Sequence, residues 1–161
     1  MTNLVFDRMT DLAACLCAQI EADGGPEPCF CGVIPGDAVV GDYAGDCDEQ
    51  CGMAWVRLIA TYPATGVGQA DESVGNCGST LGFDLEIGIL RCITIHDDGS
   101  PLTLEESSDA TRLQTADMMT MWRAISCCDS FTSKDYVLGS YQPLGPLGGL
   151  VGGGFQIRTV I

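Results

Sequence analysis

The sequence predicts an α+β domain in which a mainly antiparallel four-stranded sheet is covered on one face by two helices. Apolar residues recur at spacings of three and four in two segments, which is typical of helices, and they alternate with polar residues through residues 81–95, which is typical of a half-buried strand. We therefore expect the order helix, strand, strand, helix, strand, strand. The 161 residues are expected to form a single domain, 1–161, with long loops.

The first helix is expected at about residues 3–22. Its apolar stripe consists of Val5, Met9, Leu12, Leu16 and Ile20. Thr2 or Asn3 can cap its N-terminus, and Gly24, Gly25 and Pro26 end it.

Two strands follow, at 53–62 and 81–95, and they are expected to pair as an antiparallel hairpin. Pro63 ends the first strand, and the odd positions of the second are apolar except for Arg91. The second helix is expected to begin at a capping box formed by Thr103 and Glu106 and to end near Cys128. Its predicted apolar side contains Leu113, Ala116, Met118, Met121, Trp122 and Ile125. Strands at 136–141 and 155–160 complete the sheet, joined by a Gly- and Pro-rich link.

Two long segments without periodicity, about 26–52 and 63–80, are candidate arms that contact a partner. Loops longer than about 12–15 residues are uncommon in compact domains and usually carry function. The second arm is Gly-rich and polar, so it is expected to be an interface. Its candidate residues are Gly66, Gly68, Asp71, Glu72 and Asn76.

The net charge of −15, from 22 acidic and 7 basic residues, argues against nucleic-acid binding through neutralised phosphates. An acidic surface either keeps the protein soluble or repels DNA that passes close by. We expect no membrane segment, because no apolar run approaches the roughly 20 residues that span a bilayer. The N-terminus, with Asp7 and Arg8, does not look like a signal peptide, so synthesis in the cytoplasm is expected.

Ten cysteines are present in a chain without an export signal, and reduced thiols are the favoured interpretation. Two alternatives stay open for the loop cysteines. They can form disulfides after release from the cell, or Cys29, Cys31, Cys47 and Cys51 can bind zinc. The zinc interpretation is weakened by the C-x-C spacing of the first pair, because zinc sites usually show C-x2-C.

No catalytic constellation is found, so we expect the protein not to be an enzyme and to hold no cofactor. His96, beside Asp97 and Asp98, is the one histidine of the chain, and no nucleophile can be assigned to it from the sequence. The glycine-rich stretch at 145–154 lacks the Lys and Ser/Thr of a phosphate-binding loop.

Five stretches of the chain resemble the tail terminator (tail completion) proteins of long-tailed phages of actinobacteria. They are CFCGVIPGDAVV, GMAWVRLIATYP, CGSTLGFDLEIGILRC, DMMTMWRAISCC and PLGPLGGLVGGGFQIRTV, which together cover 70 of the 161 residues. None of them is a catalytic signature, and Phe155 stands where relatives are expected to carry Trp.

The resemblance implies a ring, by analogy with lambda-type terminators a homo-hexamer, in the neck of the virion. Such a ring binds the last ring of the tail tube protein, stops tube growth and joins the head–tail connector, while DNA passes through the lumen without specific binding. Asp84 and Glu86, on the polar side of one strand, are candidates for a lumen-facing wall or for an ordinary solvated face. The alternatives are a connector or stopper ring of the same neck and a cysteine-rich metal-binding adaptor.

Overall fold

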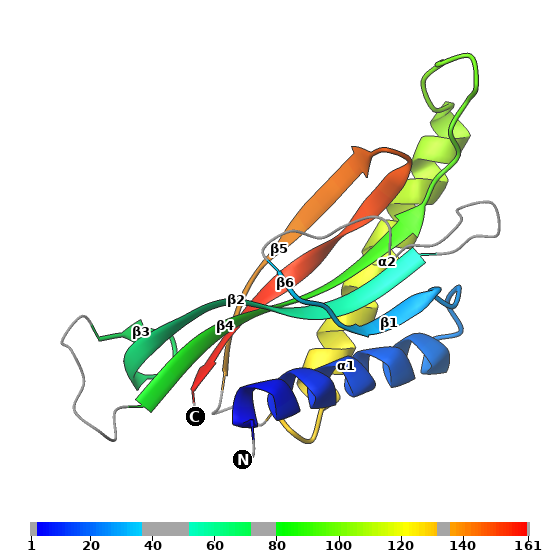
Figure 1. Ribbon diagram of the computed structural model, residues 1–161. Helices are drawn as coiled ribbons and strands as arrows, with labels where there is room; N and C mark the ends of the chain where they lie inside the picture. The colour runs from blue at the N-terminus through cyan, green and yellow to red at the C-terminus, as the bar shows by residue number, and fades with distance from the viewer. Residues whose placement is uncertain (1–2, 37–51, 72–79, 132–135, 161) are drawn as a thin grey trace.

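The computed structural model describes residues 3–36, 52–71, 80–131 and 136–160. In these residues two helices accompany a six-stranded mixed sheet (Figure 1). The expected four-stranded antiparallel sheet in the order αββαββ is therefore wrong. The elements are α1 (Leu4–Ala22), β1 (Phe30–Val33), β2 (Gly52–Gly66), β3 (Gln69–Ala70), β4 (Thr80–Cys92), α2 (Leu104–Cys127), β5 (Tyr136–Leu147) and β6 (Leu150–Val160).

The strand order across the sheet is β1-β2-β4-β6-β5, with β3 paired to β2. Strand β1 was missed by the sequence analysis, and it runs parallel to β2 from Phe30 opposite Met53 to Val33 opposite Val56. Four residues that include a glycine and a cysteine show no recognisable period. Their pairing with a strand about twenty residues away depends on tertiary context rather than on local preference.

Strand β2 continues through Pro63 to Gly66, so the expected second arm begins as strand rather than as a loop. The carbonyl of Pro63 accepts a hydrogen bond of 2.8 Å from the backbone N–H of Asp71, on the side away from β4. The nitrogen of Pro63 points to that same side, because the N–H and C=O of one strand residue face the same neighbour. The proline therefore removes no hydrogen bond between β2 and β4.

The Gly- and Pro-rich link that was expected between the last two strands is itself strand. Strands β5 and β6 form a long hairpin that turns at Gly148 and Gly149, which have φ of +55° and +80°. A Cβ at Gly152 would lie 2.0 Å from the carbonyl oxygen of Ile89 on β4. Close packing of β6 on β4 therefore requires glycine at this position.

Both helices pack on the same face of the sheet. The main core joins the buried stripe of α1, the buried side of α2 and the odd-numbered positions of β4, and its largest members are Leu12, Leu16, Phe83, Leu85, Ile87, Ile89, Met121 and Ile125. The capping box of Thr103 and Glu106 at the start of α2 is confirmed. Trp122, expected on the buried side of α2, is instead exposed. No described helix is long and apolar enough to span a bilayer.

The opposite face of the sheet has a smaller apolar cluster, formed by Ile34, Met53, Trp55 and Leu90. It lies beside the polar residues of β2, β4 and β6. Trp55 lies across Gly88 of β4, where a Cβ would come within 2.1 Å of the indole ring. The sheet therefore presents one face to the helices and a mixed apolar and charged face on the other side.

Candidate assembly surfaces

Among the described residues, β2 has an unpaired stretch on its outer side. Ile34 donates a hydrogen bond to the carbonyl of Val56, which ends the pairing with β1, and β3 begins to pair at Ala64. Over residues 57–62, β2 has β4 on one side and no described strand on the other. The pairing with β4 is irregular between Leu58 and Ala60, and the intervening Ile59 is 41% exposed.

An apolar groove of about 690 Å³ runs along this stretch between β2 and the start of α1. Phe6 and Met9 line it from α1, Pro35 from the segment after β1, and Leu58 and Ile59 from β2. Phe6 is half exposed at its rim. Open backbone groups beside apolar side chains are the features by which a sheet accepts an added extended segment.

A second open edge in the described part of the chain is the outer side of β5, the last strand in the order across the sheet. Its second half carries Pro143 and Pro146, which cannot donate backbone hydrogen bonds and so obstruct strand pairing. Its first half, residues 136–142, contains no proline and exposes Val137. The two open edges therefore belong to different strands on opposite sides of the sheet (Figure 1).

The lumen candidates Asp84 and Glu86 both lie on the sheet face opposite the helices, and each is engaged by an arginine and an aromatic donor. Glu86 accepts hydrogen bonds from Arg57 at 2.8 and 3.0 Å and from the indole of Trp55 at 3.0 Å. Asp84 accepts one from the Tyr62 hydroxyl at 3.0 Å. Arg158 of β6 lies 3.7 Å from the other Asp84 oxygen.

These carboxylates are therefore neutralised locally, and they do not form a wall of free negative charge. The pKa of the Tyr62 phenol is raised, first because the group is partly buried and then because its hydroxyl donates a hydrogen bond to Asp84. Gln156 of β6 is exposed and pairs in register with Glu86. Its uncharged side chain therefore lies next to Glu86 on the sheet face opposite the helices.

The expected second arm is only partly described. Gly66 ends β2, and Gly68 occupies the following turn with φ of +68°, beside Val137 and Arg158. Asp71 donates its backbone N–H to Pro63. Glu72 and Asn76 lie outside the described residues.

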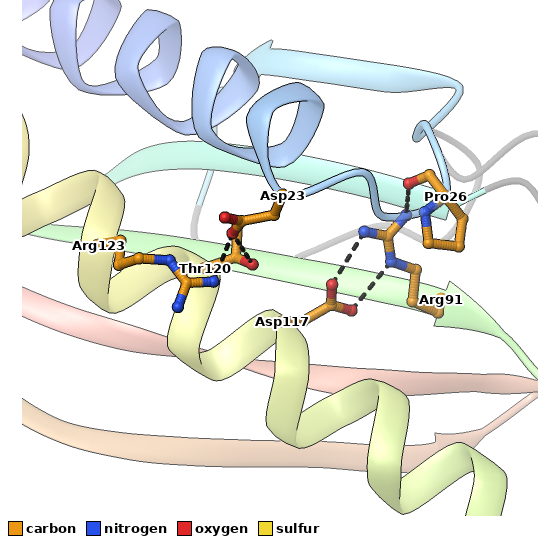
Figure 2. A network of polar contacts seen from close by, with 6 residues as sticks. All are labelled: Asp23, Pro26, Arg91, Asp117, Thr120 and Arg123. Carbon is orange, nitrogen blue, oxygen red and sulfur yellow. Dashed lines mark hydrogen bonds and ion pairs between the residues drawn. The ribbon is translucent and has the colours of Figure 1, made fainter.

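A polar network ties the end of α1 to β4 and α2 (Figure 2). Arg91, the one charged residue on the odd face of β4, forms a buried ion pair with Asp117 and donates to the carbonyl of Pro26. Asp23 accepts hydrogen bonds from Thr120 and Arg123 of α2, both at 2.6 Å. The bond from Arg123, followed by that from Thr120, lowers the pKa of Asp23. The network fixes where α1 ends relative to α2.

The cysteines differ from the expected reduced thiols. Cys15 is bonded to Cys128 and Cys17 to Cys31, and Cys29 and Cys92 are disulfide-bonded as well. Cys127 is the free, exposed thiol among the described cysteines. Cys29 and Cys31, two of the four zinc candidates, therefore have oxidised sulfurs in this structure. Cys47 and Cys51 lie outside the described residues. Among the residues that are described, no three His, Cys, Asp or Glu side chains form a group that could hold a metal ion.

His96 lies 3.0 Å from Glu106, the residue that closes the capping box of α2. The His96 ring therefore contacts the first turn of α2. The pKa of Glu106 is lowered, mainly by hydrogen bonds from the backbone and side chain of Thr103 and then by the bond with His96.

No protein-family model matches the chain, and neither does any curated protein. Any assignment of function therefore depends on the chain's own residues and geometry. Among the described residues the features that suit contact with other proteins are the two open sheet edges, and sequence reasoning found neither. The glycines and prolines of residues 143–154 predict a link rather than a strand, and the gap between β1 and β3 depends on two strands that have no sequence period.

Proposed function

We propose that this chain is a structural, non-enzymatic ring protein of the neck of a long-tailed phage, a tail terminator at the head-proximal end of the tail tube. The observation that supports it best is the pair of different open edges, the outer side of β5 and the groove beside β2. A contact between two different surfaces of identical subunits is head-to-tail, and such contacts close into rings when the rotation allows.

In the ring, residues 136–142 of one copy lie against the β2 groove of the next copy. This contact buries Ile59 and Phe6, which are exposed in the single chain. By analogy with lambda-type terminators the ring is a homo-hexamer in the virion, assembled in the host cytoplasm. Its other partners are the tail tube protein and the head–tail connector.

The sheet face opposite the helices is the proposed wall of the lumen. On this face the carboxylates of Asp84 and Glu86 are balanced by Arg158 and Arg57. A wall of paired charges holds no set of free cations for phosphates, so DNA slides past without specific binding. Replacing the exposed Gln156 by Lys adds one free cation there and should slow DNA ejection, whereas Gln156→Ala should not. Equal DNA ejection rates for the two variants would show that this face does not line the lumen.

Cryo-electron microscopy of the virion neck, with this chain traced in the density, tests the proposal. A ring between the last tube ring and the connector, with β5 of one copy beside β2 of the next, is the expected result. A ring seated directly on the portal or its adaptor would assign the protein to the connector or stopper class instead. Absence from the virion would reject both ring assignments.

A further inference from the structure

Helix α1 is covalently attached to two different parts of the fold. Cys15 is bonded to Cys128, which directly follows α2, and Cys17 is bonded to Cys31 in β1. Positions two residues apart on a helix point about 200° apart around its axis. The two bonds therefore leave α1 on different sides, one toward the other helix and one toward the edge of the sheet.

The noncovalent contacts of α1 are complete without these bonds. Leu12 and Leu16 are fully buried in the main core, and Asp23 at the end of the helix is hydrogen-bonded to Thr120 and Arg123. In a chain with reduced cysteines these noncovalent contacts still hold α1 against the rest of the fold. What such a chain lacks is a covalent barrier to local opening of α1.

We propose that the pairs Cys15–Cys128 and Cys17–Cys31 form a redox lock on α1. In the reduced protein α1 is docked but opens locally, and in the oxidised protein it is fixed to β1 and to the end of α2. The bonds close sequence separations of 113 and 14 residues, so each also restricts the unfolded chain. The lock goes beyond the proposed assembly role, because both bonds lie within one subunit and stabilise that subunit against local unfolding.

The chemistry needs an external disulfide as oxidant. One cysteine thiolate attacks a sulfur of oxidised glutathione, which releases one glutathione thiolate and leaves a mixed disulfide. The partner cysteine, as thiolate, attacks the protein sulfur of that mixed disulfide and releases the second glutathione. Overall two protein thiols lose two electrons and two protons, and one glutathione disulfide becomes two thiols.

The time at which the lock closes rests on the proposed function. A virion protein is made in a reducing cytoplasm and meets oxidants after release from the host. Subunits then enter the ring in the reduced state, and the bonds form afterwards within each subunit. A groove that includes the start of α1 thus becomes rigid only after its partner is seated.

The pairing is tested on the purified full-length chain, equilibrated with either oxidised or reduced glutathione. A protease that cuts at acidic residues separates the three cysteine groups, because Glu21 and Asp23 lie between Cys17 and Cys31, and Asp117 lies between Cys31 and Cys128. Mass spectrometry of the oxidised sample should find the α1 peptide joined to both other peptides. Recovery of free thiols at these four positions, or of different pairs, would overturn the proposal.

The effect on α1 is tested by hydrogen exchange and by thermal unfolding. Reduction should speed amide exchange in α1 at least about tenfold and lower the melting temperature by about 10 °C or more. Because Cys29 and Cys92 are reduced as well, the double variant Cys15→Ala, Cys128→Ala isolates one bond. In oxidant it should show faster exchange in α1 than the wild type.

Cys127→Ser is the matched control, because Cys127 adjoins Cys128 and has a free thiol. It should leave exchange and melting unchanged in both redox states. Equal α1 exchange in oxidised and reduced wild type would reject the lock even if the bonds form. None of these measurements depends on ring formation, so failure of the lock and failure of the assembly proposal are separate results.

Discussion

Arg91 of β4 and Asp117 of α2 form a bidentate ion pair inside the protein, with Nε–Oδ2 and Nη2–Oδ1 distances of 2.9 Å each. Arg91 is 2% exposed and Asp117 is 5% exposed. Arg91 stands on a strand face that is otherwise apolar, so the helix must supply a carboxylate at the facing position. Asp117 lies among the apolar residues of α2 for that reason, and the carbonyl of Pro26 completes the set of partners.

Removing one member of this pair should cost much more than removing both. We expect Asp117→Ala to lower the free energy of unfolding by about 3–5 kcal/mol, because it leaves the buried Arg91 charge unpaired. The double variant Arg91→Met, Asp117→Leu should recover most of that loss. Urea unfolding of the three proteins measures both quantities. A double variant as unstable as the single one would show that the pair contributes more than charge compensation.

The contact of Asp23 with Arg123 should make stability depend on pH in the acidic range. The pKa of Asp23 is lowered from its ordinary value of 3.8, so the folded state favours the carboxylate. The contribution is therefore present above pH 3.8 and is lost as the pH falls through the lower pKa of the folded state.

Asp23→Asn should reduce stability near pH 6 by less than about 1 kcal/mol, since the side chain is partly exposed. The difference between wild type and variant should shrink as the pH falls below 3.8 and through the lower pKa of the folded state. Thermal unfolding across this pH range measures it. A difference that stays constant would mean that the charge of Asp23 contributes nothing.

The glycines of β6 should be intolerant of even one added carbon atom. Gly152→Ala places a Cβ 2.0 Å from the Ile89 carbonyl, and a backbone atom inside a sheet cannot move aside. We expect a loss of about 2–4 kcal/mol in unfolding free energy, measured by chemical denaturation. Gly25→Ala is the control, because nothing lies within 4 Å of its added carbon. It should change stability by less than about 0.5 kcal/mol.

The groove beside β2 should be required for assembly but not for folding. Ile59→Asp places a charge in the proposed contact, on a side chain that is already partly exposed. We expect a folded, monomeric subunit that fails to stop tube growth, as judged by light scattering and by tube lengths in electron micrographs. Leu104→Asp, at an 86% exposed position at the start of α2, should assemble normally. Normal capping by Ile59→Asp would exclude the groove from the ring contact.

The elements with a clear period were predictable from the sequence alone. The helices expected at about 3–22 and from the Thr103 cap to near Cys128 are observed as Leu4–Ala22 and Leu104–Cys127. The alternation in β4 identified the strand and its buried face. It did not identify the end of the strand, which is Cys92 rather than Ile95, because Cys92 pairs with Leu150, the first residue of β6, and the neighbouring strand extends no further.

The tertiary structure decided the remaining features. Phe30–Val33 is a strand because it pairs in parallel with β2. The glycines at 152–154 are in a strand because their backbone pairs with β4, although they have no side chains that could show a period. The partners of Arg91, Asp84 and Glu86 come from other elements and were not predictable. Periodic patterns in the sequence show which face of a single helix or strand is apolar and therefore buried. Pairing between distant strands, disulfides and ion pairs depends on contacts between elements, which only the folded chain brings within a few ångströms.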